Sequence, residues 1–579
     1  VTVDTVRNCI WGYNPVHRIY QGWGEKAGFS GWFVVQLQKP IHSFGVRDTV
    51  AYVSMDVHAG EMVLAKAATS FTDLQGAWDN LQAEIPSWDF LGTRLALDSI
   101  WQRQFQAIPV ESEDKAQVNQ FYGALYLTSF LPRTMSDVKT STHGARYPMF
   151  ANDSLIRTLR KPVYGDFSMW DIYRAQLPLL NIIEPKRTSD MMSSLANMYF
   201  FGGWMHIFPC WNSYTTAMIG DHTGSAIADA TVKGVNGFDL KLAYEGIRQN
   251  AFDNPQTMEE YRNGMGRRAL KSYLQYGYIP LEDSVNEAFH TQEQVSRTLE
   301  YAYDDFCVAQ VAKALGQKKD YNALMKRAKN WRNVINPNTG WADGRYKSGK
   351  WLGNNDITHR VPFITEGAVI HYSFYVPHDV YGLMSAMGGR QKFISKMDTL
   401  FGYTGDSTNY SLLPELSYYW HGNEPCHQIP YLYAYAGQPW KTQQLVHHIL
   451  QTEYLDVPGG LSGNDDAGQM SAWYIFSALG FYPVCPGTAY YVLGSPSFRH
   501  AMIGQMVIEA PNASPANIYI QSVLWNGQPY SRTYITHDML THGGTLTILT
   551  GPKPNLTWGA NKADLPPDVM GEVSKTFER

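Results

Sequence analysis

Two short segments of the sequence, residues 420–427 and 463–474, concentrate side chains that could bind a cation and move protons. Their chemically active members are Trp420, His421, Asn423, Glu424, Asn464, Asp465 and Asp466. Carboxylates beside amide oxygens suit a hard cation such as calcium. Paired acids beside aromatic rings suit general acid–base chemistry on a sugar. Each segment leads into an aromatic, apolar run, at 431–435 and 473–479, so we expect helices to deliver both segments to one place.

Composition limits the class of protein. The 579 residues are 44% hydrophobic and 17% charged, which predicts a globular protein with more than one packed unit. The net charge of −5 argues against nucleic acid as a partner. The sequence contains no run of about twenty apolar residues, so no membrane span is expected. The five cysteines form no CxxC pair, which speaks against a zinc site.

The pattern of apolar residues changes along the chain. Residues 1–75 alternate apolar and polar as antiparallel strands do, and 76–115 have helical spacing that predicts linker helices. Residues 116–488 alternate helical runs with loops, and 489–579 return to strand-like alternation, which predicts a β layer packed on the helices. Roughly a dozen helices suit six inner and six outer helices of an (α/α)6 toroid. Helix counting alone leaves an α-solenoid open.

Several blocks of the sequence resemble one known family. Besides the two opening segments, they are Trp170–Ala175, Gly220–His222, Arg297–Asp305, Thr365–Gly367, Val376–Asp379 and Gly437–Gln443. These blocks resemble motifs of the calcium-dependent exo-acting α-mannosidases of glycoside hydrolase family 92, and they follow one another in the same order as in that family. The resemblance implies an α+β multidomain protein with an (α/α)6 toroid as catalytic domain, an N-terminal β-sandwich and a C-terminal β layer. Family members begin with a longer β-domain, so we expect the sandwich to be truncated here and the chain to be a mature or trimmed form.

The resemblance also assigns roles to the acidic residues. It implies that Glu366 is the general acid and that Asp466 is the general base, with Asp465 as the second choice. It places calcium on Asn423 and Glu424, with help from Asn464 and Asp465. The apolar neighbours of Glu366 would raise its pKa, as a proton donor requires. The open alternatives are a capping role for Glu366 or for one of the aspartates, and sugar binding by Glu424 without metal.

Further side chains are candidates for binding the substrate. They are Trp170, Asp171, Asp221, His222, His371, Trp420 and His421. Asp171 and Arg174 look like hydroxyl-binding residues at the bottom of the pocket, although Arg174 equally suits a buried structural bridge. His371 lies in the segment 368–371, where the chain departs from the family: Ala368, Ile370 and His371 replace the usual Asn, Trp and Gln. This departure concerns recognition of the leaving group.

The expected function is that of an exo-α-mannosidase that removes terminal α-linked mannose with inversion and with calcium as cofactor. Its partner would be a mannose-containing oligosaccharide or a glycoprotein glycan, with no nucleic acid and no membrane span involved. A secreted, extracellular or periplasmic location is expected. The alternatives are an (α/α)6 hydrolase or phosphorylase acting on α-glucosides, and a catalytically silent mannose-binding module.

Overall fold

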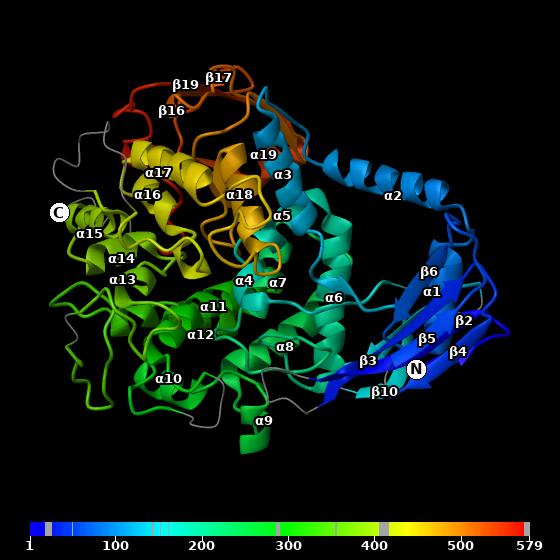
Figure 1. Ribbon diagram of the computed structural model, residues 1–579. Coiled ribbons are helices and arrows are strands. Elements are labelled where there is room, and N and C mark those ends of the chain that lie inside the picture. Colours follow the sequence, from blue (N-terminus) through cyan, green and yellow to red (C-terminus); the bar gives the residue numbers. More distant parts are fainter. Residues whose placement is uncertain are drawn as a thin grey trace.

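The computed structural model describes residues 1–17, 26–48, 50–141, 144–150, 152–159, 161–284, 290–353, 356–403 and 416–571 (Figure 1). Within them, a small N-terminal β region, a large helical body and a C-terminal β region follow one another along the chain. Figure 1 places the N-terminal strands on one side of the helical body and the C-terminal strands above it.

The N-terminal strands predicted before residue 75 are present. A four-stranded antiparallel sheet consists of β1 (Thr2–Asp4), β2 (Cys9–His17), β3 (Lys26–Leu37) and β6 (Ala65–Ser70), and β4 (Ser43–Arg47) forms a hairpin with β5 (Val50–Ser54). Helix α1 (Leu74–Glu84) covers the sheet, because its buried residues Ala77 and Leu81 pack with Cys9 and Val34. Two further strand pairs are β8 (Arg133–Thr134) with β11 (Tyr164–Gly165), and β9 (Ala145–Met149) with β10 (Asn152–Leu159).

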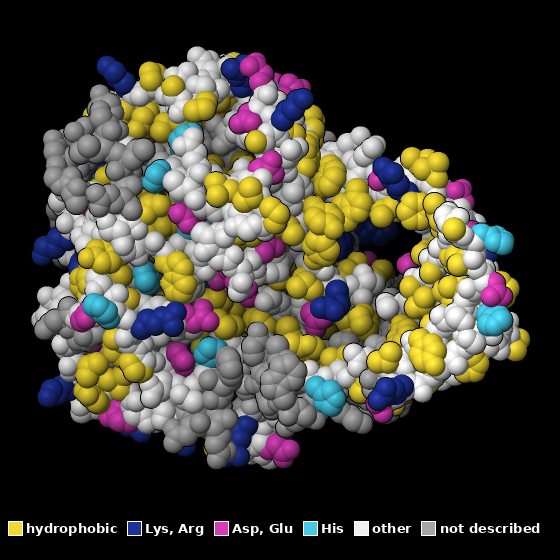
Figure 2. All heavy atoms as spheres, in the orientation of Figure 1, with side chains coloured by type: hydrophobic (Ala, Val, Ile, Leu, Met, Phe, Trp, Pro, Cys, Tyr) yellow, Lys and Arg dark blue, Asp and Glu magenta, His cyan; other side chains and the backbone are white. Residues whose placement is uncertain are grey.

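Helix α2 (Phe90–Phe105) links the N-terminal sheet to the helical body and buries none of its residues. Large apolar side chains therefore face solvent along it, among them Phe90, Leu91 and Leu95, which are 70%, 60% and 55% exposed. Figure 2 shows apolar side chains gathered where this helix crosses between the two regions. Helices α1 and α2 thus overlap the range 76–115, where the sequence analysis expected linker helices.

In the part of the chain that the structure describes, six helix pairs build the helical body. In chain order they are α5 (Gln176–Ile183) with α6 (Pro185–Gly202), α7 (Thr223–Val232) with α8 (Leu240–Phe252), α11 (Gln294–Ala314) with α12 (Lys318–Arg327), α14 (Val380–Ala386) with α15 (Arg390–Phe401), α16 (Leu432–Tyr435) with α17 (Pro439–Thr452), and α18 (Gln469–Leu479) with α3 (Lys115–Leu127). Every residue of α18 is buried, whereas α12 buries only Leu324. Helices that are buried all round form the inner ring and one-sided helices the outer ring. Because the first helix of the body pairs with the last, the ring closes on itself.

Short elements carry the loops between these pairs. They are α4 (Met169–Ile172), α9 (Met258–Arg262), α10 (Leu270–Tyr276), η1 (Asn330–Val334), α13 (Val369–Tyr372), η2 (Glu424–Cys426) and η3 (Ile429–Tyr431). Three of them, α4, α13 and η2, hold or directly follow the residues that the sequence analysis singles out. The functional loops therefore sit on brief helical turns at the ends of the inner helices.

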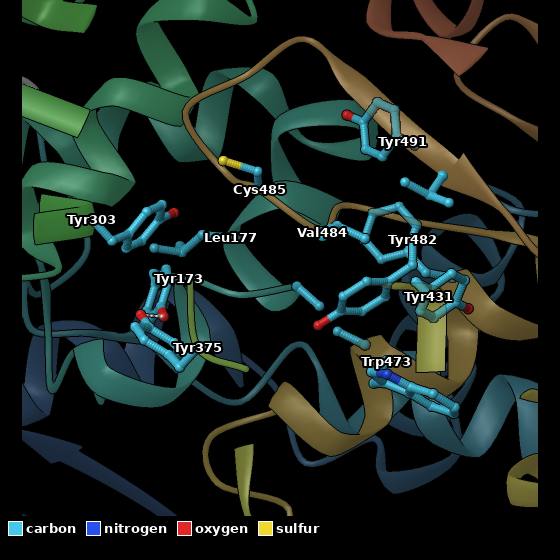
Figure 3. Packing of buried hydrophobic residues seen from close by; sticks show 14 of the residues in the cluster. Tyr173, Leu177, Tyr303, Tyr375, Tyr431, Trp473, Tyr482, Val484, Cys485 and Tyr491 are labelled. Atoms are coloured by element: carbon cyan, nitrogen blue, oxygen red, sulfur yellow. Dashed lines mark hydrogen bonds between the residues drawn. The ribbon is translucent and has the colours of Figure 1, made fainter. Parts of the chain in front are cut away.

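The core of the ring is unusually rich in aromatic rings (Figure 3). Tyr431 stacks on Tyr482 with ring centroids 5.0 Å apart, and the Tyr431 hydroxyl lies 2.8 Å from Ser477 Oγ. Trp473, on α18, is fully buried and donates its indole N–H to the carbonyl of His427. Helix α18 is thereby tied to the segment 420–427, so core packing fixes one opening segment of the sequence against the other.

The C-terminal strands form the predicted β layer. A six-stranded sheet has the order β17 (Gln528–Pro529), β16 (Tyr519–Trp525), β19 (Gly544–Gly551), β15 (Met506–Glu509), β14 (His500–Ile503) and β7 (Val110–Glu111). A second sheet consists of β12 (Phe481–Tyr482), β13 (Tyr490–Leu493) and β18 (Tyr534–Thr536), next to α19 (His537–His542) and η4 (Lys562–Asp564). Strand β7 comes from the linker, so the linker is anchored to the far end of the chain.

Candidate active site

Three carboxyl groups converge from distant parts of the chain. Asp171 lies on α4, Glu424 opens η2 and Asp466 precedes α18, and oxygens of all three lie within 4.8 Å of one another. Asp171 and Glu424 are buried, and Asp466 is half-buried. Burial and mutual repulsion raise the pKa of Asp171 and of Glu424 well above their ordinary values, and burial raises that of Asp466.

Two oxygen atoms at this cluster have no hydrogen-bond donor among the described residues. Asn423 Oδ1 and Glu424 Oε1 are both buried without a partner among the described residues. Unpaired buried oxygens are costly, so such a pair beside three carboxylates suits a bound cation. Calcium takes six to eight oxygen ligands, preferably from carboxylates, amides and water. The residues present therefore fit a calcium ion.

The candidate acid Glu366 lies at the mouth of the same site. Its side chain is accessible to solvent, and its Oε2 atom lies 3.5 Å from Asn423 Nδ2. Crowding by surrounding protein raises the pKa of Glu366; nearby His290 lowers it, and Asp466 raises it again. A carboxyl group that keeps its proton beside an accessible pocket can donate that proton to a bound substrate.

Both candidate catalytic residues have left-handed backbone. The φ angles are 55° at Glu366 and 44° at Asp466. A residue other than glycine is strained in this region, by about 1–3 kcal/mol, unless its surroundings compensate. Ser296 Oγ accepts the N–H of Thr365 and holds the Glu366 loop against α11. Such strain is concentrated at functional sites, and here it falls on both candidate catalytic residues.

The structure leaves Asp465 outside the group of three carboxylates, whereas the sequence analysis had Asp465 and Asn464 help to hold the metal. Oδ1 of Asp465 accepts the backbone N–H of Ser471 at 3.1 Å and its hydroxyl at 2.6 Å. Asp465 therefore caps α18, because it satisfies an N–H of the first turn that has no partner within the helix. Asn464 is exposed to solvent. The cluster instead contains Asp171, which the sequence analysis had taken for a substrate-binding residue.

His421 is held by its neighbours and does not face the pocket as a substrate-binding residue would. Its Nδ1 lies 2.8 Å from the Tyr419 hydroxyl and its Nε2 lies 2.7 Å from the Tyr454 hydroxyl. Burial lowers the pKa of His421 well below its ordinary value, so the ring is neutral. His427 is equally occupied, because its ring nitrogens contact the carbonyl of His421 and the amide of Gln469. Both histidines support the two loops.

The floor of the site is built around Glu300, on α11. Glu300 Oε1 accepts the Trp170 indole N–H at 3.0 Å and the Tyr372 hydroxyl at 2.9 Å. Trp170 directly precedes Asp171, and Tyr372 ends α13 behind the Glu366 loop. One buried carboxylate thus ties the cluster to the candidate acid. The Arg174 guanidinium lies across the same floor, 4.9 Å from the Trp170 ring and 4.8 Å from the Tyr173 ring, and its Nε donates to the Trp170 carbonyl at 3.0 Å.

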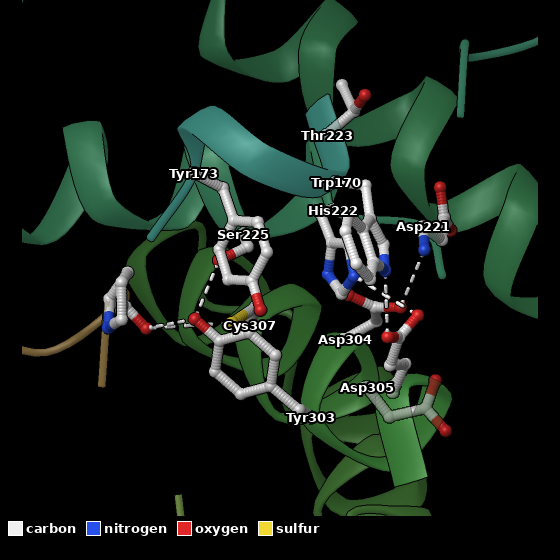
Figure 4. Close-up of polar contacts among 12 residues, drawn as sticks. Trp170, Tyr173, Asp221, His222, Thr223, Ser225, Tyr303, Asp304, Asp305 and Cys307 are labelled. Carbon is white, nitrogen blue, oxygen red and sulfur yellow. Dashed lines mark hydrogen bonds and ion pairs between the residues drawn. The ribbon is translucent and has the colours of Figure 1, made fainter. Parts of the chain in front are cut away.

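Beneath the floor lies a network of paired charges (Figure 4). His222 lies 2.8 Å from Asp304 and 3.4 Å from Glu300, and these carboxylates raise its pKa to about 9 although burial opposes the rise. Asp221 accepts hydrogen bonds from Arg267 at 2.8 Å and from Asn250 at 3.0 Å. Asp221 and His222 are both buried. They support the wall of the pocket from within, whereas the sequence analysis had them as candidates for binding the substrate.

His371 and Trp420 lie at the entrance. The His371 ring accepts the N–H of Ala368 at Nδ1, 3.1 Å away, and its Nε2 lies 2.8 Å from the Tyr418 carbonyl. The ring therefore joins the Glu366 loop to the segment before Trp420. Trp420 is 37% exposed, with the Arg360 guanidinium 5.7 Å from its ring. An open aromatic ring beside the candidate acid can support a sugar.

The sequence analysis missed Glu300 and Tyr372 as residues of the site. Glu300 lies in the block Arg297–Asp305, and Tyr372 directly follows the segment 368–371. A glutamate within a long helix shows no sequence pattern that would mark it as a residue of the site. Within the part of the chain that the structure describes, no helix is long and apolar enough to cross a bilayer.

Comparison with known proteins agrees with this geometry. Residues 76–552 match the model of the glycosyl hydrolase family 92 catalytic domain. The structure is similar to the GH92 α-mannosidase BT3965 of Bacteroides thetaiotaomicron, with 31% identity, a TM-score of 0.85, and 97% of this chain and 74% of that one covered. It is also similar to the GH92 inverting mannosidase BT2199 of the same bacterium, with 28% identity, a TM-score of 0.88, and 98% and 79% covered.

A curated relative, an uncharacterized secreted glycosidase of Arthroderma benhamiae, is 28% identical over 553 residues. The match covers 89% of this chain and 64% of that protein. The predicted combination of an (α/α)6 toroid with β-rich regions is confirmed by the likeness to the two mannosidase structures. With the family model spanning most of its length, the chain belongs to glycosyl hydrolase family 92.

Proposed function

We propose that this protein is an exo-acting α-mannosidase that hydrolyses terminal α-linked mannose with inversion at the anomeric carbon. The observation that supports this best is the meeting of the accessible Glu366 with the cluster of Asp171, Glu424 and Asp466 around unpaired oxygens. Two relatives of known structure are described as an α-mannosidase and an inverting mannosidase. The first of these relatives, BT3965, also has a structure in complex with mannoimidazole.

Glu366 donates its proton to the glycosidic oxygen as the bond to the leaving sugar breaks. Asp466 accepts a proton from a water molecule, which attacks the anomeric carbon from the opposite face. Burial raises the pKa of Glu366, which favours its protonated form and so its role as proton donor. Asp465 takes no part in this step, because its carboxylate is engaged by Ser471.

Asp171, Asn423, Glu424 and Asp466 would hold calcium. When bound, the ion supplies positive charge that can orient sugar hydroxyls and stabilise developing negative charge. The chain itself prepares the site: Glu300 positions the Trp170–Asp171 turn, and the Trp473 indole positions the backbone of the segment 420–427. The pocket floor is therefore rigid before any ligand arrives.

The proposed partner is a mannose-containing oligosaccharide or a glycoprotein glycan, met outside the cell or in the periplasm. Trp420 and Arg360 at the entrance offer a surface for the sugar that leaves. The description of the fungal relative as secreted supports this location.

Turnover of aryl α-mannosides and aryl α-glucosides tests the proposal. We expect release of mannose only, with β-mannose as the first anomer that NMR detects. Preference for the glucoside, or a requirement for phosphate, would indicate an α-glucoside hydrolase or phosphorylase. Binding of mannose without turnover would indicate a mannose-binding module. First-formed α-mannose would contradict inversion.

A further inference from the structure

Two arginines lie close together in the interior, next to residues 215–220. Arg268 and Arg297 are only 8% and 4% exposed. Both donate a hydrogen bond to the backbone carbonyl of His290, Arg297 from Nη2 at 2.9 Å and Arg268 from Nη1. Two guanidinium groups that share one acceptor bring like charges together away from water, which is unfavourable unless negative charge is near.

The negative charge around this pair is incomplete. Glu293 lies 3.5 Å from Nη2 of Arg297, and its other oxygen lies 3.3 Å from Nδ1 of His290. Among the described residues, no carboxylate forms an ion pair with Arg268. Burial and the neighbouring Arg297 accordingly lower the pKa of Arg268 to about 10.

The preceding residue shows what a compensated arginine looks like in the same environment. Arg267 is completely buried and contacts two carboxylates, Asp221 at 2.8 Å and Asp305 at 2.6 Å. Adjacent residues of one chain therefore differ sharply in charge balance. The deficit lies on the side of Arg268 and Arg297.

A cavity of about 20 Å³ opens on that side, lined by Thr216, Gly220, Tyr261, Arg268 and Arg297 among others. A space of roughly 10–15 Å³ holds one water molecule, so this cavity holds one water or one small ion and excludes a sugar. The Tyr261 hydroxyl accepts the N–H of Ala269 at 2.8 Å, which leaves its own proton for a ligand. The cavity thus offers hydrogen-bond donors and positive charge.

We propose that this cavity binds a small monovalent anion, chloride, between Arg268, Arg297 and the Tyr261 hydroxyl. The ion supplies the missing negative charge and so stabilises the start of α11. That region supports the candidate acid, because the N–H of Glu293 bonds to the carbonyl of Pro362 and the N–H of Val295 to that of Phe363, just before the Glu366 loop. The anion site is separate from the carboxylate cluster and would support the same loop.

Thermal unfolding at constant ionic strength tests this site. Sodium gluconate is replaced stepwise by sodium chloride, bromide or sulfate, with calcium gluconate present throughout. We expect a saturable rise in Tm of a few degrees with chloride and bromide and none with sulfate, because binding to the native state alone raises its stability. Arg268→Gln should abolish the rise, while Arg94→Gln, on exposed α2, should keep it. Crystals soaked in bromide should show an anomalous peak between Arg268 and Arg297.

Equal Tm values in chloride and gluconate would overturn the proposal, as would a chloride effect that Arg268→Gln retains or a water in place of the bromide peak. If Arg268→Gln does not fold, Tyr261→Phe serves instead, and the chloride concentration for half the effect should rise several-fold. All these readouts are independent of mannosidase activity, so they stand whether or not the proposed function is correct.

Discussion

Two groups of buried acids lie near one another in the toroid and differ in how their charge is balanced. Asp221, Asp304 and Asp305 each contact a positively charged arginine or histidine. Asp171, Glu424 and Asp466 lie within 4.8 Å of one another, and the described residues place no lysine, arginine or histidine in an ion pair with them. Burial and repulsion raise the pKa of Asp171 and of Glu424 by more than the nearby Arg174 lowers it. This difference in ion pairing distinguishes the structural acids from those of the candidate active site. Buried acids that pair with an arginine or a histidine stabilise the fold. Buried acids without such an ion pair are candidates for binding a cation, a proton or a substrate.

The largest expected effect is that of removing the candidate base. Asp466→Asn should lower kcat by about three or more orders of magnitude, the upper part of the range for a general base. Binding of mannose in the presence of calcium should persist, since an amide oxygen can still face the ion. The matched variant Asp465→Asn should lower Tm and retain most of its activity, because Asp465 caps α18. If Asp465→Asn is the more damaging change to kcat, the base lies one residue earlier.

The next effect is that of the candidate acid. Glu366→Gln should slow hydrolysis of a natural mannoside about a hundredfold. A dinitrophenyl mannoside should suffer far less, because its leaving group needs no proton. Equal losses on both substrates would assign Glu366 a structural role, such as supporting Asn423.

Stability should respond with opposite signs in the two groups of acids. In protein stripped of metal, Asp171→Asn should raise Tm, because it removes repulsion within the cluster. Asp305→Asn should lower stability by about 3–5 kcal/mol, because it leaves the buried Arg267 and the half-buried Arg327 without this carboxylate. Differential scanning calorimetry measures both. A drop in Tm for both variants would show that the cluster is compensated in some other way.

The smallest effect concerns a buried histidine outside both groups. His206 stacks on Tyr214 with ring centroids 4.5 Å apart, and both its ring nitrogens lack partners among the described residues. Burial lowers its pKa to about 3. Because the unfolded chain binds a proton near pH 6.5 and the folded protein does not, stability falls as the pH drops from about 6.5 toward 3.

His206→Phe should remove this part of the acid sensitivity, about 2 kcal/mol between pH 6.5 and 5. The exposed His58→Phe serves as the matched control and should leave the pH dependence unchanged. Chemical denaturation at both pH values measures the difference. An unchanged slope in His206→Phe would mean that the ring is already protonated in the native protein.

Much of the fold could be predicted from the sequence, because helices and strands follow from local periodicity. The sequence segments that form α11, α17 and α18 are examples of such periodicity. The pairing of α18 with α3 closes the ring between residues far apart in the chain, and periodicity carries no such information. The family resemblance supplied it.

The site was predictable in its main acids and not in its geometry. Glu366, Glu424 and Asp466 were singled out from their motifs, and the structure brings them together. Asp465 bonds to Ser471, whereas Asp466 joins the carboxylate cluster. The backbone between them is left-handed at Asp466, and the types of the neighbouring residues do not reveal this conformation. The position of Glu300 beneath Trp170 depends on the packing of α4 against α11, which is a tertiary contact.

The most direct test of the account is calcium binding by isothermal titration calorimetry, on protein freed of metal by exhaustive chelation. Wild type and Asp465→Asn should bind one calcium ion per chain with similar affinity. Asp171→Asn and Glu424→Gln should lose most of that affinity, and mannosidase activity should return in step with the bound calcium. Unchanged binding in Asp171→Asn and Glu424→Gln, or full activity without calcium, would contradict the assignment of the unbalanced carboxylates to a cation site.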